Sequence, residues 1–148
     1  MNTGNLTFTI IKPNSVASGD VGRIIDRLIC GGFVLRALRM LRMERARAEQ
    51  FYAVHRERPF FDELTGFMTS GPVVVALLEG EDAVARLRSL VGNTDPALAE
   101  QGTIRRDFGL DKTRNAIHAS DSDLNAAVEW QQFFTEEEIN ACTAHQGR

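Results

Sequence analysis

The sequence is poor in cysteine and has no long apolar run. Its two cysteines, Cys30 and Cys142, are too few for a disulfide framework or a cysteine-based metal site. Cys30 lies in an apolar helical pattern, so we expect it to pack in the core. No stretch has the length and hydrophobicity of a membrane span, and none resembles a signal peptide. We therefore expect a cytoplasmic protein that has no membrane partner.

Several short motifs that mark common active sites are also absent. The chain has no G-x-x-x-x-G-K-[ST] phosphate loop and no G-x-G-x-x-G dinucleotide fingerprint. It has no H-E-x-x-H pair and no cluster of Cys and His with zinc-ligand spacing. A G-x-S-x-G turn, which marks many serine hydrolases, is missing as well. Each absence excludes the class of site that depends on that motif.

Lysine is scarce among the basic residues. Fifteen of the 17 basic residues are arginine, and the lysines are Lys12 and Lys112. The net charge of −3 and the pI near 5.6 argue against a stable nucleic-acid partner, because such proteins neutralise many phosphates. Arginine offers a planar fork that suits phosphate and carboxylate, although a bias in genome composition gives the same count. The excess of arginine therefore leaves the ligand open.

The hydrophobic pattern predicts one α+β domain over residues 1–148. Alternating or continuous apolar runs predict strands at residues 6–13, 33–43, 72–80 and 116–118. Helical periodicity predicts helices at residues 18–32, 44–57, 59–71, 81–92 and 122–134, and a helical turn at 135–139. Asp95 and Pro96 are expected to open one or two further helical turns. This order fits a ferredoxin-like βαββαβ antiparallel sheet with helices on one face and an added helical hairpin.

His118 stands at the end of the last predicted strand, in "RNAIHASDSD". If this stretch is extended, Ala116, His118 and Ser120 share one face, and the small neighbours leave room beside the imidazole. By residue type alone, His118 fits a structural histidine, a general base, a metal ligand or a nucleophile. His145 lies in the polar C-terminal tail and is expected to be exposed.

Five further polar residues lie at or beyond the ends of predicted elements, where ligand sites gather. These candidates for phosphate binding are Lys12, Arg88, Thr94, Arg105 and Asn115. Each is equally compatible with a solvated surface position. Their spacing along the chain does not establish that they converge.

The motif "NAIHASDS" resembles the N-x-x-H-[GA]-S-D signature of the nucleoside diphosphate kinases. The segments "TFTIIKP", "GRIIDRLICGGF", "YAVHRERPFF", "MTSGPVVVALLEG" and "GTIRRDFG" agree with that family in order and spacing. The resemblance runs from Leu6 to Ile139. It implies a ferredoxin-like fold with an added hairpin. It also implies transfer of the γ-phosphate of a nucleoside triphosphate to a nucleoside diphosphate, through a phosphohistidine.

The resemblance also implies roles for individual residues. His118 aligns with the nucleophile, and Glu129 and Ser120 with the pair that supports it. Residues that hold phosphate or ribose align with Lys12, Tyr52, Arg88, Thr94, Arg105 and Asn115. Phe60 aligns with the aromatic residue that stacks on the base, and we expect either Phe60 or Phe61 to pack in the core instead. Mg²⁺ is the implied cofactor, and it is expected to bind through the nucleotide phosphates rather than in a protein cage.

Four positions depart from the family pattern. Asn14 replaces a common Asp, and Ala119 a common Gly, whose methyl group is tolerated if the backbone there is not left-handed. Lys112 replaces a small apolar residue beside the base. Arg106 replaces a frequent Gly and is expected to add charge near the pocket mouth.

Two questions stay open at the level of sequence. The family forms tetramers and hexamers built from dimers, so a homo-oligomer is expected, but its size is not fixed by the sequence. A different class of protein is also compatible with the predicted fold. This alternative is a ferredoxin-like nucleotide-binding regulatory or scaffold module that has no turnover.

Overall fold

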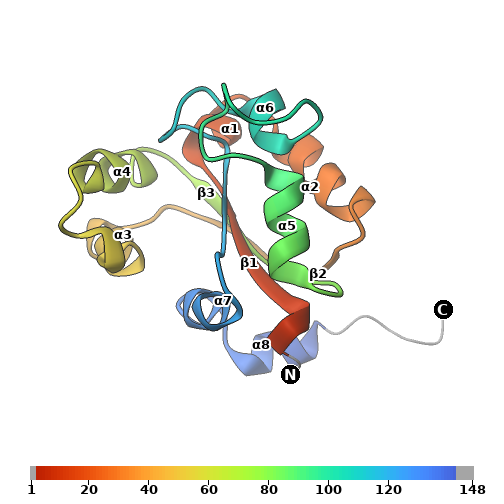
Figure 1. The fold of residues 1–148 in the computed structure, drawn as a ribbon. Coiled ribbons are helices and arrows are strands. Elements are labelled where there is room, and N and C mark those ends of the chain that lie inside the picture. Colours follow the sequence, from red (N-terminus) through yellow and green to blue (C-terminus); the bar gives the residue numbers. More distant parts are fainter. Residues whose placement is uncertain (1–2, 143–148) are drawn as a thin grey trace.

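The fold is built on a four-stranded antiparallel sheet (Figure 1). A computed structural model describes residues 3–142 of the chain. The strands lie in the order β2-β3-β1-β4. Their bounds are β1 Leu6–Ile11, β2 Val34–Leu41, β3 Val73–Glu79 and β4 Ile117–Ala119. The predicted ferredoxin-like sheet is therefore confirmed.

Helical segments connect these strands. The bounds are η1 Thr3–Asn5, α1 Pro13–Ala17, α2 Val21–Cys30, α3 Arg45–Phe51, η2 Ala53–His55, α4 Phe61–Met68, α5 Ala83–Val91, α6 Ile104–Phe108, α7 Asp123–Trp130 and α8 Glu136–Ala141. The predicted hairpin between β2 and β3 consists of α3, η2 and α4, and it projects to one side of the sheet (Figure 1).

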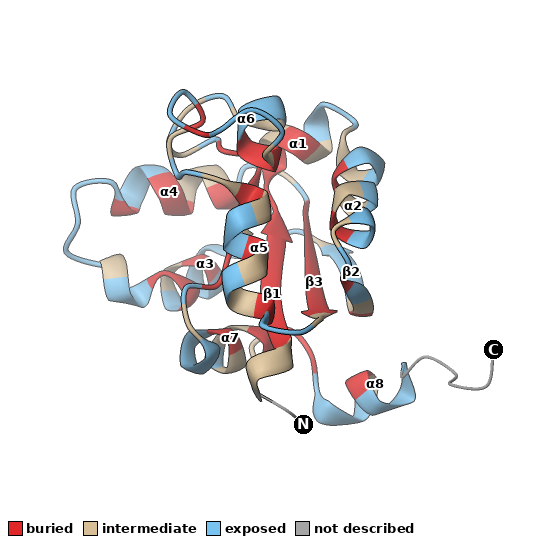
Figure 2. Cartoon of the chain, turned by 45° about the vertical axis from the view of Figure 1, so that its right-hand side comes forward, coloured by how far each residue is buried: buried red, intermediate tan, exposed pale blue. Residues whose placement is uncertain are grey.

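Helices cover both faces of the sheet, which corrects the expectation of a single covered face. Strands β1 and β3 are buried along almost their whole length (Figure 2). One core joins one face of these strands to α2, α5 and α6, through residues such as Ile24, Leu87 and Ile104. The other core joins Phe8 and neighbouring residues to α3, α4 and the segment that follows α7. A strand with two buried faces reads as an apolar run, as β3 does.

Two local predictions fail for identifiable reasons. Cys30 is exposed, because it lies about 200° around α2 from the buried Leu28. The helix predicted over residues 122–134 ends at Trp130, and the side chains of Arg47 and Arg39 bind the carbonyls of Gln132 and Phe133. These carbonyls are thereby satisfied outside a helix.

The segment between α5 and β4 also differs from expectation. The expected start at Asp95 is present: its carboxylate accepts a hydrogen bond from the Ala97 N–H at 3.0 Å, as an N-cap would, and a single turn follows, within the one or two expected. The helix of this segment is α6, which was not predicted. Its cap is Thr103, whose hydroxyl accepts from the Arg106 N–H at 3.3 Å. His145 lies outside the described residues.

A strained turn precedes β4. Ala116 has φ of 78°, and the Ile117 N–H donates to the Asn115 carbonyl at 3.0 Å. A hydrogen bond across one residue with positive φ defines a γ-turn of the rare, strained kind. The turn breaks the strand alternation, so Ala116 packs with Ile117 and Ala119 rather than sharing the His118 face. The Ala116 carbonyl accepts from the Lys12 N–H at 2.8 Å, which ties the turn to the end of β1. Ala119 itself has no positive φ, so its methyl group is accommodated.

The turn makes position 116 selective for small residues. Ala116→Val is expected to lower the free energy of unfolding by about 2 kcal/mol or more, because left-handed backbone and overpacking each cost roughly 1–3 kcal/mol. Ala116→Gly relieves the backbone strain, which stabilises the folded protein. It also removes a buried methyl group and makes the unfolded chain more flexible, and each of these two effects destabilises the folded protein by roughly 1 kcal/mol. The Gly variant should therefore stay within about 1 kcal/mol of the wild type. Chemical denaturation measures both variants, and a Val variant as stable as the Gly variant would contradict the assigned strain.

Candidate active site

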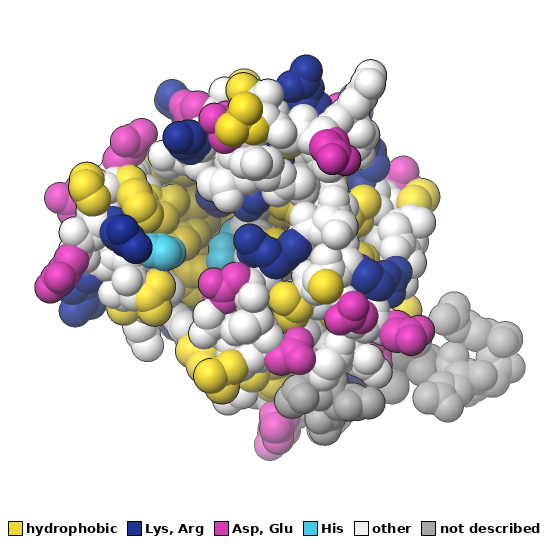
Figure 3. Space-filling view, in the orientation of Figure 1, with side chains coloured by type: hydrophobic (Ala, Val, Ile, Leu, Met, Phe, Trp, Pro, Cys, Tyr) yellow, Lys and Arg dark blue, Asp and Glu magenta, His cyan; other side chains and the backbone are white. Residues whose placement is uncertain are grey.

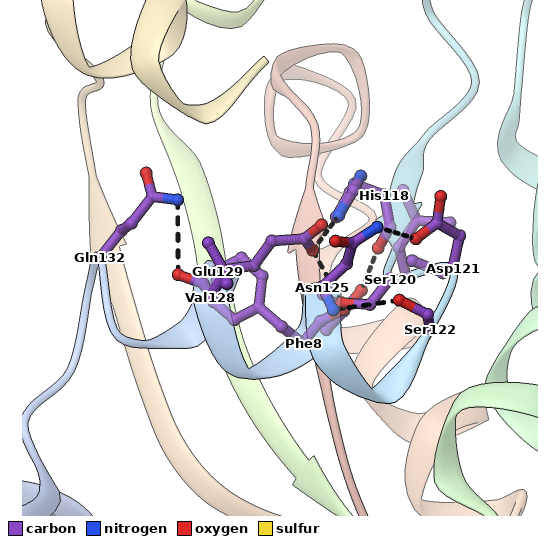
Figure 4. A network of polar contacts seen from close by, with 12 residues as sticks. Phe8, His118, Ser120, Asp121, Ser122, Asn125, Val128, Glu129 and Gln132 are labelled. Atoms are coloured by element: carbon purple, nitrogen blue, oxygen red, sulfur yellow. Dashed lines mark hydrogen bonds and ion pairs between the residues drawn. The ribbon is translucent and has the colours of Figure 1, made fainter. Parts of the chain in front are cut away.

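His118 lies on the short strand β4 and faces α7 (Figure 4). Its Nε2 is 2.7 Å from Oε1 of Glu129, which α7 carries. A carboxylate only accepts hydrogen bonds, so the shared proton belongs to Nε2. The neutral ring then has a lone pair on Nδ1, which points away from Glu129 in Figure 4. Within residues 3–142, no hydrogen bond to Nδ1 is present.

Ser120 and three aromatic rings hold this pair in place. Ser120 is fully buried, and its hydroxyl donates to the same Glu129 oxygen at 2.7 Å (Figure 4). The Phe51 ring meets the imidazole edge-on, with centroids 5.1 Å apart. Tyr52 and Phe8 lie at 6.3 and 6.4 Å. The imidazole is therefore fixed in orientation by packing as well as by the carboxylate.

The imidazole opens into a pocket of about 1010 Å³. This hollow lies beside the α3–α4 hairpin, and cationic and histidine side chains gather around it (Figure 3). Nine of the ten residues named from the sequence line it: Lys12, Tyr52, Phe60, Arg88, Thr94, Arg105, Asn115, His118 and Glu129. The tenth, Ser120, lies behind the pocket wall and contacts Glu129. The predicted phosphate-binding residues, whose spacing along the chain did not establish that they converge, therefore lie around one pocket.

Three of the four cationic side chains that line this pocket are held by backbone carbonyls. Among the described residues, Lys12, Arg88 and Arg105 form no salt bridge. They donate instead to backbone carbonyls: Lys12 to Thr113 at 3.3 Å, Arg88 to Ala119 at 3.3 Å, and Arg105 to Gly92 and Ile117 at 3.0 and 2.9 Å. Carbonyls orient the cations without neutralising them. The three cations lie close enough for Arg105 to repel both Lys12 and Arg88, so an anion placed between them would be favoured.

Burial makes this charge costly in the absence of an anion. Burial, aided by the charge of Arg105 and opposed by Asp111, lowers the pKa of Lys12 to about 7. Burial and the neighbouring Arg88 lower the pKa of Arg105 to about 10. Burial and the charge of Glu129 raise the pKa of Tyr52, which keeps its phenol neutral. An anion in the pocket would favour the protonated, charged forms of Lys12 and Arg105.

Unpartnered polar atoms also mark the pocket. The Tyr52 hydroxyl, the Asn115 carbonyl oxygen and the Arg105 Nε are buried without a partner among the described residues. The Asn115 amide nitrogen donates to the carbonyls of Thr94 and Lys112, at 2.9 and 3.0 Å. Buried polar atoms usually find partners, so these three are suited to receive groups of a ligand.

The aromatic predictions divide as expected. Phe61 is buried in the core, whereas Phe60 is 42% exposed and lines the pocket. Tyr52 follows the end of α3, and His55 sits on η2 with its ring 5.4 Å from that of Phe60. Both residues reach the same pocket.

Asp121 and Asn125 line the pocket as well and were not named from the sequence. The Asn125 amide donates to the Asp121 carboxylate at 2.5 Å (Figure 4). The available signal was that Asp121 is the aspartate of the His118 motif and that Asn125 follows it at i+4. Arg106, expected near the pocket mouth, points elsewhere and donates to the Ala97 carbonyl at 3.1 Å. The charge expected from Arg106 therefore does not reach the pocket.

Neither a metal-binding cluster of side chains nor a helix that could cross a membrane is present in residues 3–142. No group of three or more His, Cys, Asp or Glu side chains there could hold a metal ion. No helix in that part of the chain is long and apolar enough to cross a membrane.

An oriented imidazole beside cations that form no salt bridge defines a site of the phosphoryl-transfer class. Such a reaction needs positioning of the phosphate and stabilisation of its charge.

Comparisons with known proteins identify the family. A family model described as nucleoside diphosphate kinase matches residues 5–139. A nucleoside diphosphate kinase from Sulfurimonas denitrificans is 54% identical over 134 residues, which cover 90% of this chain and 98% of that protein. The solved structure of the Aquifex aeolicus nucleoside diphosphate kinase is 49% identical, with a TM-score of 0.90, covering 91% of this chain and 98% of that one. A halophilic relative from Halobacterium salinarum, solved in complex with CDP, is 39% identical with a TM-score of 0.87, and the match covers 91% of this chain and 90% of that one.

The chain belongs to the nucleoside diphosphate kinase family. The predicted enzyme class, a phosphotransferase that moves the γ-phosphate of a nucleoside triphosphate to a nucleoside diphosphate, is confirmed. The alternative of a regulatory or scaffold module without turnover is not favoured.

The lowered pKa of Lys12 predicts a pH-dependent gain in stability from Lys12→Met. Below about pH 7 the lysine is charged in both states, so the folded protein bears the full burial penalty, roughly 5 kcal/mol. Between about pH 7 and 10.5 the unfolded chain binds more protons, so wild-type stability rises with pH relative to the variant. Denaturation curves across this window should show the stabilising effect of Lys12→Met shrinking toward zero. A difference that is independent of pH would contradict the shift.

Proposed function

We propose that this chain transfers phosphate in two half-reactions through His118. In the first, the Nδ1 lone pair forms a bond to the γ-phosphorus, and the bond from that phosphorus to the β,γ-bridging oxygen breaks. The nucleoside diphosphate leaves, and a second one takes the phosphate in the reverse of these steps. The Nε2–Glu129 hydrogen bond carries this proposal, because it leaves Nδ1 free in a pocket that Lys12, Arg88 and Arg105 also line.

Glu129 and Ser120 act as positioning residues in this scheme. A carboxylate that accepts from Nε2–H fixes the tautomer that is nucleophilic at Nδ1. It also stabilises the positive charge that develops on the ring as the P–N bond forms. Ser120 holds that carboxylate from behind.

Lys12, Arg88 and Arg105 neutralise the transferring phosphate. Negative charge spreads over its non-bridging oxygens in the transition state, and arginine meets such oxygens with paired N–H donors. Lys12 supplies a point charge, and an anion beside it favours its protonated form.

The remaining pocket residues fit the rest of a nucleotide. The Tyr52 hydroxyl and the Asn115 carbonyl oxygen, both buried without a partner among the described residues, offer hydrogen bonds to phosphate or ribose, and Thr94 lines the same pocket. The half-exposed Phe60 offers a face on which any base can stack. The CDP bound by the Halobacterium salinarum relative supports such an occupant.

The site also fits Mg²⁺ carried by the nucleotide. No protein cage is present in residues 3–142, and Asp121 supplies one carboxylate to the pocket, which matches how Mg²⁺ binds with phosphates and waters. The ion would neutralise charge on the phosphates when bound. Positioning of those phosphates falls to the three cations.

A phosphoenzyme experiment tests the function. The protein is mixed with Mg²⁺ and γ-labelled ATP, quenched under alkaline denaturing conditions, and a parallel sample is chased with unlabelled GDP. We expect close to one acid-labile label per chain, transfer of that label to GTP, and no label on His118→Asn. Label retained on His118→Asn, or none on the wild type, would contradict the proposal.

We also propose that residues 1–148 form one domain that assembles into a homo-oligomer. Strand β2 is an edge strand of the sheet. Leu38 and Met40 on it are 49% and 58% exposed. Ile29 on α2 is 51% exposed. An unpaired strand edge with apolar side chains is a surface that proteins cover. A second copy of the chain is the occupant that the family suggests, with tetramers or hexamers built from such dimers.

Light scattering after gel filtration tests this assembly. The wild type should have a mass of four or six chains of 16.4 kDa. Leu38→Glu should lower the mass, because the charge would be buried in the interface. Leu124→Glu, at a residue 76% exposed on α7, is the matched control and should leave the mass unchanged. A monomeric wild type would overturn the proposed oligomer.

A further inference from the structure

Lys112 is a cation of the pocket to which the proposed mechanism gives no role. It is exposed and lines the same pocket as His118. Its backbone is anchored to the site, because its carbonyl accepts from the Asn115 amide at 3.0 Å. The lysine stem therefore starts from a fixed point at the pocket edge.

The ammonium of Lys112 has no ion-pair partner among the described residues. The adjacent Asp111 carboxylate is already engaged. It accepts from the Arg114 side chain at 2.7 and 3.0 Å, and from the backbone N–H groups of Thr113 and Arg114 at 3.0 and 2.7 Å. These bonds also lower the pKa of Asp111. Asp111 is thus committed to its own loop, and the Lys112 ammonium remains available to a ligand.

The pocket has a direction. Lys12, Arg88 and Arg105 gather the phosphates at the His118 end. Phe60 and Leu64, on the hairpin side, supply an apolar surface to the same pocket. Under the proposed function, the base stacks on Phe60, and the flexible Lys112 side chain lines the same pocket.

We propose that Lys112 sets the base preference of this enzyme, favouring bases with a keto group over bases with an amino group. An ammonium only donates hydrogen bonds. Guanine presents acceptors at O6 and N7, whereas adenine presents an N6 amino donor beside N7. Uracil, like thymine, carries a keto oxygen at C4 where cytosine carries an amino group. The inference rests on the proposed function and adds a specificity residue to it.

The discriminating measurement uses the isolated phosphoenzyme, discharged separately by GDP, ADP, UDP and CDP. For the wild type, kcat/KM should be at least threefold higher for GDP than for ADP, and for UDP than for CDP. In Lys112→Met, which keeps length and loses charge, both ratios should fall toward one. In Lys112→Arg, which keeps the donor and the charge, both should persist. The matched control is Arg106→Met, which removes a cation outside the pocket and should leave both ratios unchanged.

The outcomes separate the two proposals. Failure to form a phosphoenzyme would contradict the proposed function itself. A phosphoenzyme whose ratios are the same in Lys112→Met and in the wild type would overturn the role of Lys112 alone. Loss of the ratios in Lys112→Arg, or in Arg106→Met, would equally overturn a direct contact from the Lys112 charge.

Discussion

The hydrogen bond between His118 and Glu129 is the interaction on which the site depends. It joins β4 to α7, decides which ring nitrogen carries the proton, and sets the direction of the other nitrogen. Ser120 donates a hydrogen bond to Glu129, and the rings of Phe51 and Tyr52 pack against the His118 imidazole, so all three hold this contact in place. The strained turn at Ala116 leads directly into it and is tied to the end of β1, where Lys12 lies.

The second constraint is electrostatic. Lys12 and Arg105 are buried without counter-ions in the described part of the chain, and their lowered pKa values record the cost of that arrangement. Backbone carbonyls hold these cations in position but leave their charge available. Because the buried charges raise the free energy of the pocket when no anion is bound, the binding of phosphates lowers that free energy strongly. The buried cations thus lower the folding stability of the free protein and raise its affinity for a polyanionic substrate.

The features that depend on neighbouring residues in the chain could be predicted from the sequence. The strand ends that carry Lys12 and His118, and the cap that starts α8, followed from alternation and capping residues. The convergence of Arg88, Thr94 and Arg105 came only through the family resemblance, since long-range folding brings them together. The left-handed Ala116 and the exposed Cys30 were missed because tertiary packing, rather than local pattern, decides them. Asp121 was missed although it is the aspartate of the motif that contains His118.

The most direct test of this account is to identify the phosphorylated nitrogen. Phosphoenzyme labelled with ¹⁵N in its histidine rings distinguishes Nδ1 from Nε2 by the one-bond coupling between ¹⁵N and ³¹P in NMR spectra. The account predicts phosphate on Nδ1 of His118, since Glu129 occupies Nε2. Phosphate on Nε2 would show that the hydrogen bond to Glu129 breaks during the reaction, and it would contradict the central claim.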